Sequence, residues 1–340
     1  MKKRIFWSCL ALGGVLAADL LLSAGTHGPF DYVPSTSFDQ AMALQADVTE
    51  EWMSMDGVVG TAIGFDAKGD AVVKVYLTSP GIVSFPSFVQ GVQVVPEVTG
   101  RFMALPLEDE ATVDPTNSFP RPVPIGVSSG HGQVTAGTLG ARVSSGGETF
   151  ALSNNHVFAA NNDANQGDHL LQPGVVDGGR DPDDVIGTLA DFEPIHFCKM
   201  VCQANRIDAA IASVATDDVG TETPSGGYGA PRSTPIDATI GMSVQKYGRT
   251  TGHTTGQVSG LNATIDVGYR TGTARFEGQI VISGRGFSAG GDSGSLVVAK
   301  GMLLGDRRPV GLLFAGTATT TLANPIDWVL DRFDITIDGN

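Results

Sequence analysis

The chain has 340 residues, of which 41% are hydrophobic and 17% are charged, and this balance excludes a disordered protein. Its formal net charge of −15, without clustered Lys or Arg, argues against nucleic acid and anionic membrane surfaces as partners, because each phosphate contact needs a cation. Glycine is abundant, at 45 residues, and long periodic helical stretches are few. This combination predicts a mainly β fold with tight turns between short strands.

Residues 1–25 have the layout of a secretory signal peptide. Three basic residues at 2–4 precede an apolar run at 5–22, and small residues follow at 23–25. An uncleaved membrane anchor is the alternative, but Asp19 leaves the uninterrupted apolar part shorter than a bilayer core requires. We therefore expect a secreted or periplasmic protein that has no stable membrane insertion after the signal is removed.

A small α/β domain is predicted over residues 36–105. Ser37 and Gln40 form a capping-box pattern, and apolar residues then recur at helical spacing, which predicts a helix over 38–55. The runs VVGTAIGF and AVVKVYLT, joined by DAKGD, predict a hairpin of two strands. The run GVQVVPEV predicts a further strand, and Pro96 indicates that this strand lies at a sheet edge.

An acidic and then proline-rich stretch at 106–121 is predicted to be a linker. Beyond it, residues 122–336 contain short strand-like runs separated by turns, and a second linker-like stretch at 220–235 divides them into two halves. Halves of about a hundred residues each predict two small β-barrels, at about 122–220 and 236–336, with a cleft where they meet.

Three cysteines are present, and Cys9 would leave with the signal peptide. The remaining pair, Cys198 and Cys202, is an even number in an oxidising compartment, which predicts a short-loop disulfide. A zinc site that also uses His196 is the alternative, but no fourth ligand stands nearby at metal-site spacing. We expect neither a metal nor another cofactor, and the sequence leaves the oligomeric state open.

Three short segments could together carry chemistry. His156 lies in LSNNHVF where a strand ends, Asp208 begins the apolar run IDAAIA, and Ser293 lies in GGDSGS. Taken singly, Ser293 is more typical of a polar glycine-rich turn, and His156 of a histidine that satisfies buried backbone groups. Together they supply a hydroxyl nucleophile, a base that removes its proton and an acid that orients the base. Gly291 and Ser293 could also direct their backbone N–H groups to one point, as an oxyanion hole requires.

In this order, the three segments resemble the catalytic segments of trypsin-like serine peptidases of the chymotrypsin fold. The run PVGLLFAG resembles the strand that lines their substrate cleft, and the resemblance spans about 122–334. YGRTTG and the extra N-terminal unit are similar to a bacterial subgroup related to the narrow-leaf proteins of plants. The resemblance implies a chymotrypsin-like double β-barrel and a serine endopeptidase with protein or peptide substrates, in which His156 is the general base, Asp208 its orienting acid and Ser293 the nucleophile.

Two other functions stay open at this point. The first is a binding module that keeps the double barrel but turns over weakly or not at all. The presence of all three residue types favours the enzyme. The second gives residues 36–105 the main role, as an inhibitory or folding-assisting pro-region.

The resemblance also implies the position of the substrate pocket and a route of activation. The pocket would be formed by four residues: Phe287, Phe314, Ala315 and Gly316. No carboxylate lies in 287–291, so we expect small or medium apolar side chains to be preferred over Arg and Lys; if Phe287 instead turns into the core, a deeper pocket would take aromatics. Many relatives become active when a newly freed N-terminus pairs with the residue before the nucleophile, here Asp292. Arg121 precedes a proline, which argues against that route and leaves the partner of Asp292 open.

Overall fold

The computed structural model describes residues 36–104, 114–301 and 306–340. The expected signal peptide lies outside these residues, as does the first half of the expected linker. Residues 34–340 form one compact unit. In the described part of the chain, no helix has both the length and the apolar character that crossing a membrane requires. The domain boundaries expected from the sequence stay predictions.

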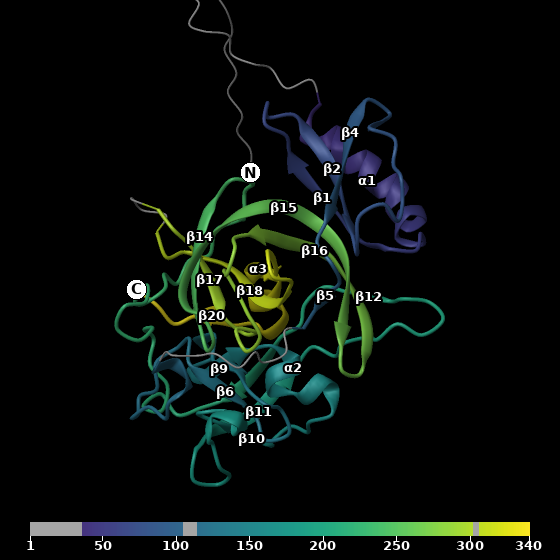
Figure 1. Ribbon diagram of the computed structural model, residues 1–340. Helices are drawn as coiled ribbons and strands as arrows, with labels where there is room; N and C mark the ends of the chain where they lie inside the picture. The colour runs from purple at the N-terminus through teal and green to yellow at the C-terminus, as the bar shows by residue number, and fades with distance from the viewer. Residues whose placement is uncertain (1–35, 105–113, 302–305) are drawn as a thin grey trace, which may run out of the picture. The chain divides into compact units, whose positions relative to one another are not determined.

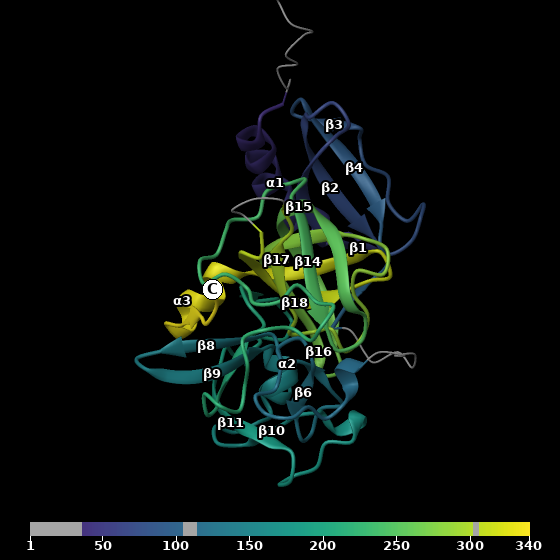
Figure 2. The same ribbon diagram turned by 90° about the vertical axis from the view of Figure 1, so that its left-hand side faces the viewer.

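The helix α1 (Phe38–Met53) begins where the capping pattern predicted. The side chain of Ser37 accepts a hydrogen bond from the N–H of Gln40 at 3.1 Å, which satisfies one of the free donors of the first turn. Ala41, Leu44 and Trp52 lie on one face and are buried. These residues share an apolar cluster with strand residues of the neighbouring sheet, and Figure 2 shows the helix next to that sheet. The helix ends two residues earlier than predicted.

The predicted hairpin is formed by β1 (Val58–Phe65) and β2 (Ala71–Leu77), which pair antiparallel. The strand β4 (Val92–Val98) lies parallel to β2, and β3 (Phe88–Val89) pairs with the first two residues of β4. Pro96 therefore lies in a part of β4 that β3 does not reach, which agrees with its inability to donate to a ladder. On its other side, β1 pairs with the much later strand β15 (Gly252–Tyr269).

These strands belong to a 12-stranded sheet, and Figure 1 shows its long, curved strands. Its other members are β5 (Phe102–Met103), β12 (Ala204–Asn205), β14 (Ser243–Gly248), β16 (Gly272–Ser283), β17 (Leu296–Ala299), β18 (Pro309–Gly316) and β19 (Thr320–Pro325). β14 and β15 form a hairpin, with Gly248 opposite Gly252. One apolar cluster of this sheet contains Val244, Val258 and Ile282, and a second contains Tyr76, Phe102 and Phe314.

A second, eight-stranded sheet carries the first half of the expected β region. Its strands are β6 (Ser128–His131), β7 (Gly137–Thr138), β8 (Ala141–Ser145), β9 (Glu148–Ser153), β10 (His169–Leu171), β11 (Val185–Phe192), β13 (Ala210–Ser213) and the C-terminal β20 (Thr336–Ile337). Short helices follow two strands, α2 (Asn155–Phe158) after β9 and α3 (Ile326–Phe333) after β19. The fold is therefore mainly β with two β units and a small α/β part before them, and the expected fold class is confirmed.

Candidate active site

His156 lies in α2, directly after β9 ends. Its Nδ1 is 2.6 Å from Oδ2 of Asp208, and its backbone N–H donates to Oδ1 of the same carboxylate at 3.2 Å. The imidazole is 11% exposed, whereas the carboxylate is fully buried. Two contacts to one carboxylate fix the orientation of the ring. With Nδ1 donating to the carboxylate, Nε2 is the nitrogen that can accept a proton.

Asp208 lies just before β13 and is held through its backbone as well as its side chain. Its N–H donates to Oδ1 of Asn324 at 3.1 Å, and its carbonyl oxygen accepts from Nδ2 of Asn154 at 2.7 Å. The carboxylate accepts a further hydrogen bond from the hydroxyl of Tyr269 at 2.9 Å. Such donors are needed, because a buried carboxylate without partners is costly.

Tyr269 was not predicted from the sequence. It is the last residue of β15, and its ring lies 5.8 Å from the His156 imidazole in an edge-on arrangement. Burial and the charge of Asp208 raise the pKa of this phenol well above its ordinary value, so the hydroxyl stays protonated and donates. The only local signal is an aromatic residue before a turn, which does not indicate a partner on the other sheet.

Ser293 lies on the loop between β16 and β17, and it is 2% exposed. Its hydroxyl donates to the carbonyl oxygen of Phe314 at 3.4 Å. Among the described residues, the Ser293 side chain makes this one hydrogen bond, and it makes none with His156. The structure thus joins two of the three expected catalytic residues and places the third hydroxyl against β18. A transfer of the Ser293 proton to His156 requires the hydroxyl to leave the Phe314 carbonyl and to donate to His156 instead.

The backbone around Ser293 has the form expected of an anion site. Gly291 has a φ of +92°, a conformation that favours glycine. Within the described part of the chain, the N–H groups of Gly291 and Ser293 donate to no acceptor, although the N–H of Gly294 donates to Leu313. Thr138 donates two hydrogen bonds to this loop, both of 2.8 Å. Its Oγ1 donates to the carbonyl oxygen of Gly291, and its N–H donates to the carbonyl oxygen of Ser293. Both N–H groups are therefore available to a ligand.

Asp292 is paired with Lys246 of β14, which answers the question of its partner. Nζ of Lys246 is 3.2 Å from Oδ2 of Asp292, and both side chains are fully buried. The carboxylate also accepts from the N–H groups of Thr250, Thr251 and Ala289 and from the Thr251 hydroxyl. Burial lowers the pKa of Lys246, and the Asp292 charge opposes this shift. An internal lysine thus occupies the position expected for a new N-terminus.

The four expected pocket residues are buried. Phe287 is 1% exposed and packs in the core of the 12-stranded sheet, so of its two possible orientations the structure has the one turned into the core. Phe314 and Ala315 are fully buried, and the Phe314 ring lies 4.8 Å from that of Phe276. Gly316, the last residue of β18, is also buried.

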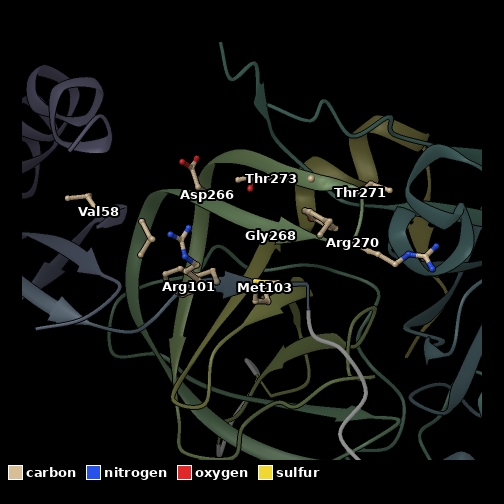
Figure 3. Close-up of a pocket in the computed structure, with 12 residues that line it drawn as sticks. Val58, Arg101, Met103, Asp266, Gly268, Arg270, Thr271 and Thr273 are labelled. Carbon is tan, nitrogen blue, oxygen red and sulfur yellow. The ribbon is translucent and has the colours of Figure 1, made fainter. Parts of the chain in front are cut away.

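A cavity of about 560 Å³ lies beside His156. Its walls include Met103, Ala104, Tyr269 and Arg270, so it is bounded partly by the segment around β5. A second cavity, of about 450 Å³, adjoins it and shares Met103, Tyr269 and Arg270 as lining residues. Figure 3 shows this second cavity. The sequence had not indicated β5 as part of the site.

Cys198 and Cys202 form a disulfide, as predicted, so their sulfurs are not free to bind zinc. The N–H of Cys198 donates to the carbonyl oxygen of Thr273 at 2.7 Å, which ties the loop to β16. The loop leads through β12 to Asp208, and Met200 at its tip is fully exposed. The disulfide therefore closes a surface loop directly before the buried acid.

The expected resemblance is confirmed by comparison with known proteins. Residues 229–325 match the model of the Nal1 C-terminal domain. Solved structures of bacterial serine proteases are also similar. Protease A of Thermobifida fusca is 21% identical and covers 64% of this chain and 100% of its own, with a TM-score of 0.45. Chymotrypsin of Cellulomonas bogoriensis is 18% identical, and the match covers 64% of this chain and 99% of that protein, with a TM-score of 0.43.

One curated relative is a plant protein. Protein NARROW LEAF 1 of Oryza sativa subsp. japonica is 30% identical over 119 residues, which cover 30% of this chain and 20% of the rice protein. The match thus spans about a fifth of that relative's length.

Proposed function

We propose that the chain is an exported serine endopeptidase that hydrolyses peptide bonds through Ser293, His156 and Asp208. The observation that carries the proposal is the 2.6 Å hydrogen bond between His156 Nδ1 and the buried carboxylate of Asp208. This bond leaves Nε2 as the nitrogen that can act as a base, and the Ser293 loop has two N–H groups, those of Gly291 and Ser293, that donate to no acceptor among the described residues.

The reaction follows from these groups. The Ser293 proton passes to Nε2 of His156 while Oγ attacks the carbonyl carbon of the substrate, and the resulting oxyanion accepts from the N–H groups of Gly291 and Ser293. The imidazolium then gives its proton to the leaving amine, and an acyl-enzyme ester remains. Water then gives a proton to His156 and attacks this ester. As the bond between the acyl group and Oγ breaks, His156 returns the proton to Ser293, and the carboxylic acid leaves.

Labelling with a fluorophosphonate probe tests the proposal, because the probe reacts with an activated serine and needs no knowledge of the substrate. We expect the parent protein to be labelled on Ser293 and the Ser293→Ala variant to be unlabelled. Ser288→Ala is the matched control, since this serine lies in the same loop and bonds Thr321 instead. Absence of labelling in the parent protein would exclude the proposed activity.

A binding module without turnover is the second candidate. It is favoured by the Ser293 hydroxyl, which bonds Phe314 and not His156. The two candidates differ in one measurement, since the module binds peptides but does not react with the probe.

The substrate preference proposed here is for apolar side chains over Arg and Lys. No carboxylate lies between Phe287 and Gly291, so a cation would lose its water without a partner. With Phe287 turned into the core, the deeper apolar pocket also takes aromatic side chains. Cleavage of a mixed peptide library measures this preference, and dominant cleavage after Arg or Lys would contradict it.

A further inference from the structure

The edge of β18 beside Ser293 is free of β17. β17 pairs with β18 from Pro309 to Leu312, and Leu312 lies opposite Leu296. Beyond Leu312, β17 does not pair with β18. On the opposite side, β19 continues to pair with β18 as far as Gly316. Leu313 still bonds Gly294 and Ser295, so the remaining residues, 314–316, present an edge to which an extended peptide can add as a strand.

The chain itself occupies this edge. Met103 of β5 pairs antiparallel with Gly316, and β5 also pairs parallel with β15, with Met103 opposite Gly268. Figure 3 shows Met103 on the short arrow of β5, next to Gly268. The N–H of Ala104 donates to the carbonyl oxygen of Gly268 at 3.0 Å. Successive residues of a strand direct their N–H groups to opposite sides, so the N–H of Met103 faces β18.

The direction of β5 is that of the acyl part of a substrate. In such a peptide the chain must run from its N-terminal side toward the carbonyl that Ser293 attacks. β5 meets β18 at Met103, which pairs antiparallel with Gly316, and the next residue, Ala104, lines the cavity beside His156. The segment thus approaches the candidate catalytic residues with its C-terminal end first.

The two halves of the segment are held with different strength. Phe102 is fully buried, and its ring lies 5.7 Å from that of Tyr76 in the core. Met103, by contrast, is 39% exposed. A Cβ on Gly268 would lie 2.7 Å from Sδ of Met103, so this side chain rests directly on the glycine. Phe102 therefore anchors the segment, while Met103 and Ala104 can leave the edge through a local opening.

We propose that Met103 and Ala104 are a built-in occupant of the acyl-side substrate site and that peptide substrates must displace them. This inference rests on the proposed peptidase function. The kcat/KM of long peptides is then little higher than that of short ones, because the added residues compete with β5 for the same edge of β18. Opening also joins the two cavities that share Met103 as a wall.

The first test compares an N-acetylated tetrapeptide nitroanilide of apolar residues with an N-acetylated single-residue ester, which is too short to reach Gly316. Met103→Pro removes the N–H that faces β18, and Met103→Gly weakens the strand if proline prevents folding. In both variants we expect kcat/KM for the tetrapeptide to rise at least tenfold relative to the ester, through a lower KM. An unchanged or lower ratio in both variants would overturn the inference.

The matched controls are Val98→Pro and Val98→Gly. Val98 is the last residue of β4 and is 50% exposed, and the N–H of the next residue, Thr99, donates to Leu77. The N–H of Val98 therefore faces away from β2, and its loss breaks no ladder bond. Both control variants should keep the ratio of the parent protein.

The second test needs no turnover. In the Ser293→Ala background, an apolar fluorescein-labelled hexapeptide is titrated by fluorescence anisotropy with and without Met103→Pro. We expect at least tenfold tighter binding with the proline, and equal affinities would overturn the inference. A parent protein that does not react with fluorophosphonate excludes the peptidase, and this binding experiment still decides the role of β5.

Discussion

Replacing Lys246 by methionine tests how strongly the ion pair with Asp292 supports the Ser293 loop. Both side chains are fully buried at 3.2 Å, so the substitution leaves a carboxylate without its cation in the interior. Removing one partner of a buried pair costs about 3 to 5 kcal/mol. Three N–H groups and one hydroxyl still donate to Asp292, so we expect a loss near the lower limit of this range.

Urea denaturation measures the loss as a change in the free energy of unfolding. The matched control is Lys74→Met, because Lys74 makes a pair with Glu97 at the same distance of 3.2 Å. There the side chains are 17% and 41% exposed, and removal of the lysine should cost less than about 1 kcal/mol. The double variant Lys246→Met, Asp292→Asn should recover part of the stability, since it removes the unpaired charge.

The same variant should label more slowly with fluorophosphonate. Asp292 lies between Gly291 and Ser293, so a shift of its carboxylate moves both N–H groups of the candidate oxyanion hole. The reasoning is refuted if Lys246→Met unfolds at the same urea concentration as Lys74→Met and is labelled at the parent rate. A loss of stability with an unchanged labelling rate would limit Lys246 to a structural role.

Three further predictions concern single groups of the site. Asp208→Asn should lower kcat on the order of ten-thousandfold, because the amide cannot hold His156 in the required tautomer, and peptide hydrolysis kinetics would show it. Mass spectrometry of exported protein under non-reducing conditions should find Cys198 and Cys202 without free thiols, and two free thiols would contradict the structure. The pKa of the Tyr269 phenol is raised in the folded protein. Above the ordinary tyrosine pKa, the folded state therefore keeps a proton that the unfolded state has lost. The free energy of unfolding should fall as the pH rises through that region. Tyr269→Phe should reduce this fall in denaturation curves at alkaline pH, and an identical pH dependence would contradict the assignment.

Features encoded within a few neighbouring residues were predicted well. The capping pair at Ser37 and Gln40 predicted the start of α1, and two strand-like runs joined by DAKGD predicted the hairpin of β1 and β2. The segment around His156 and the segment around Asp208 were both placed at strand ends, and the structure brings them together. Each of these inferences depends on short-range geometry, for which the sequence is direct evidence.

Features that depend on distant partners were missed. Lys246 belongs to a strand in which every residue from Val244 to Gly248 is buried, so the two-residue spacing of a half-buried strand does not single out the lysine. A lysine is rarely buried without a partner, so its sequence context suggests a solvated position. The local signal of Tyr269 is only an aromatic residue before a turn, and Met103 has none, because their roles arise only when β5 and β15 lie next to the cleft.

The pairing of β1 with β15 bears on how the chain reaches its native state. Gly60 lies opposite Ile265, so roughly 200 residues separate two strands that must meet. Closing so large a loop is slow, and the apolar strand β1 has no partner on that side until most of the chain has been synthesised. α1 and β2 can cover the other surfaces of β1 from the start, because both are its neighbours in sequence. The sheet that carries the Ser293 loop is therefore complete only when β15, which is synthesised late, pairs with β1, which is synthesised early. Premature pairing of β1 is the error from which the chain needs protection.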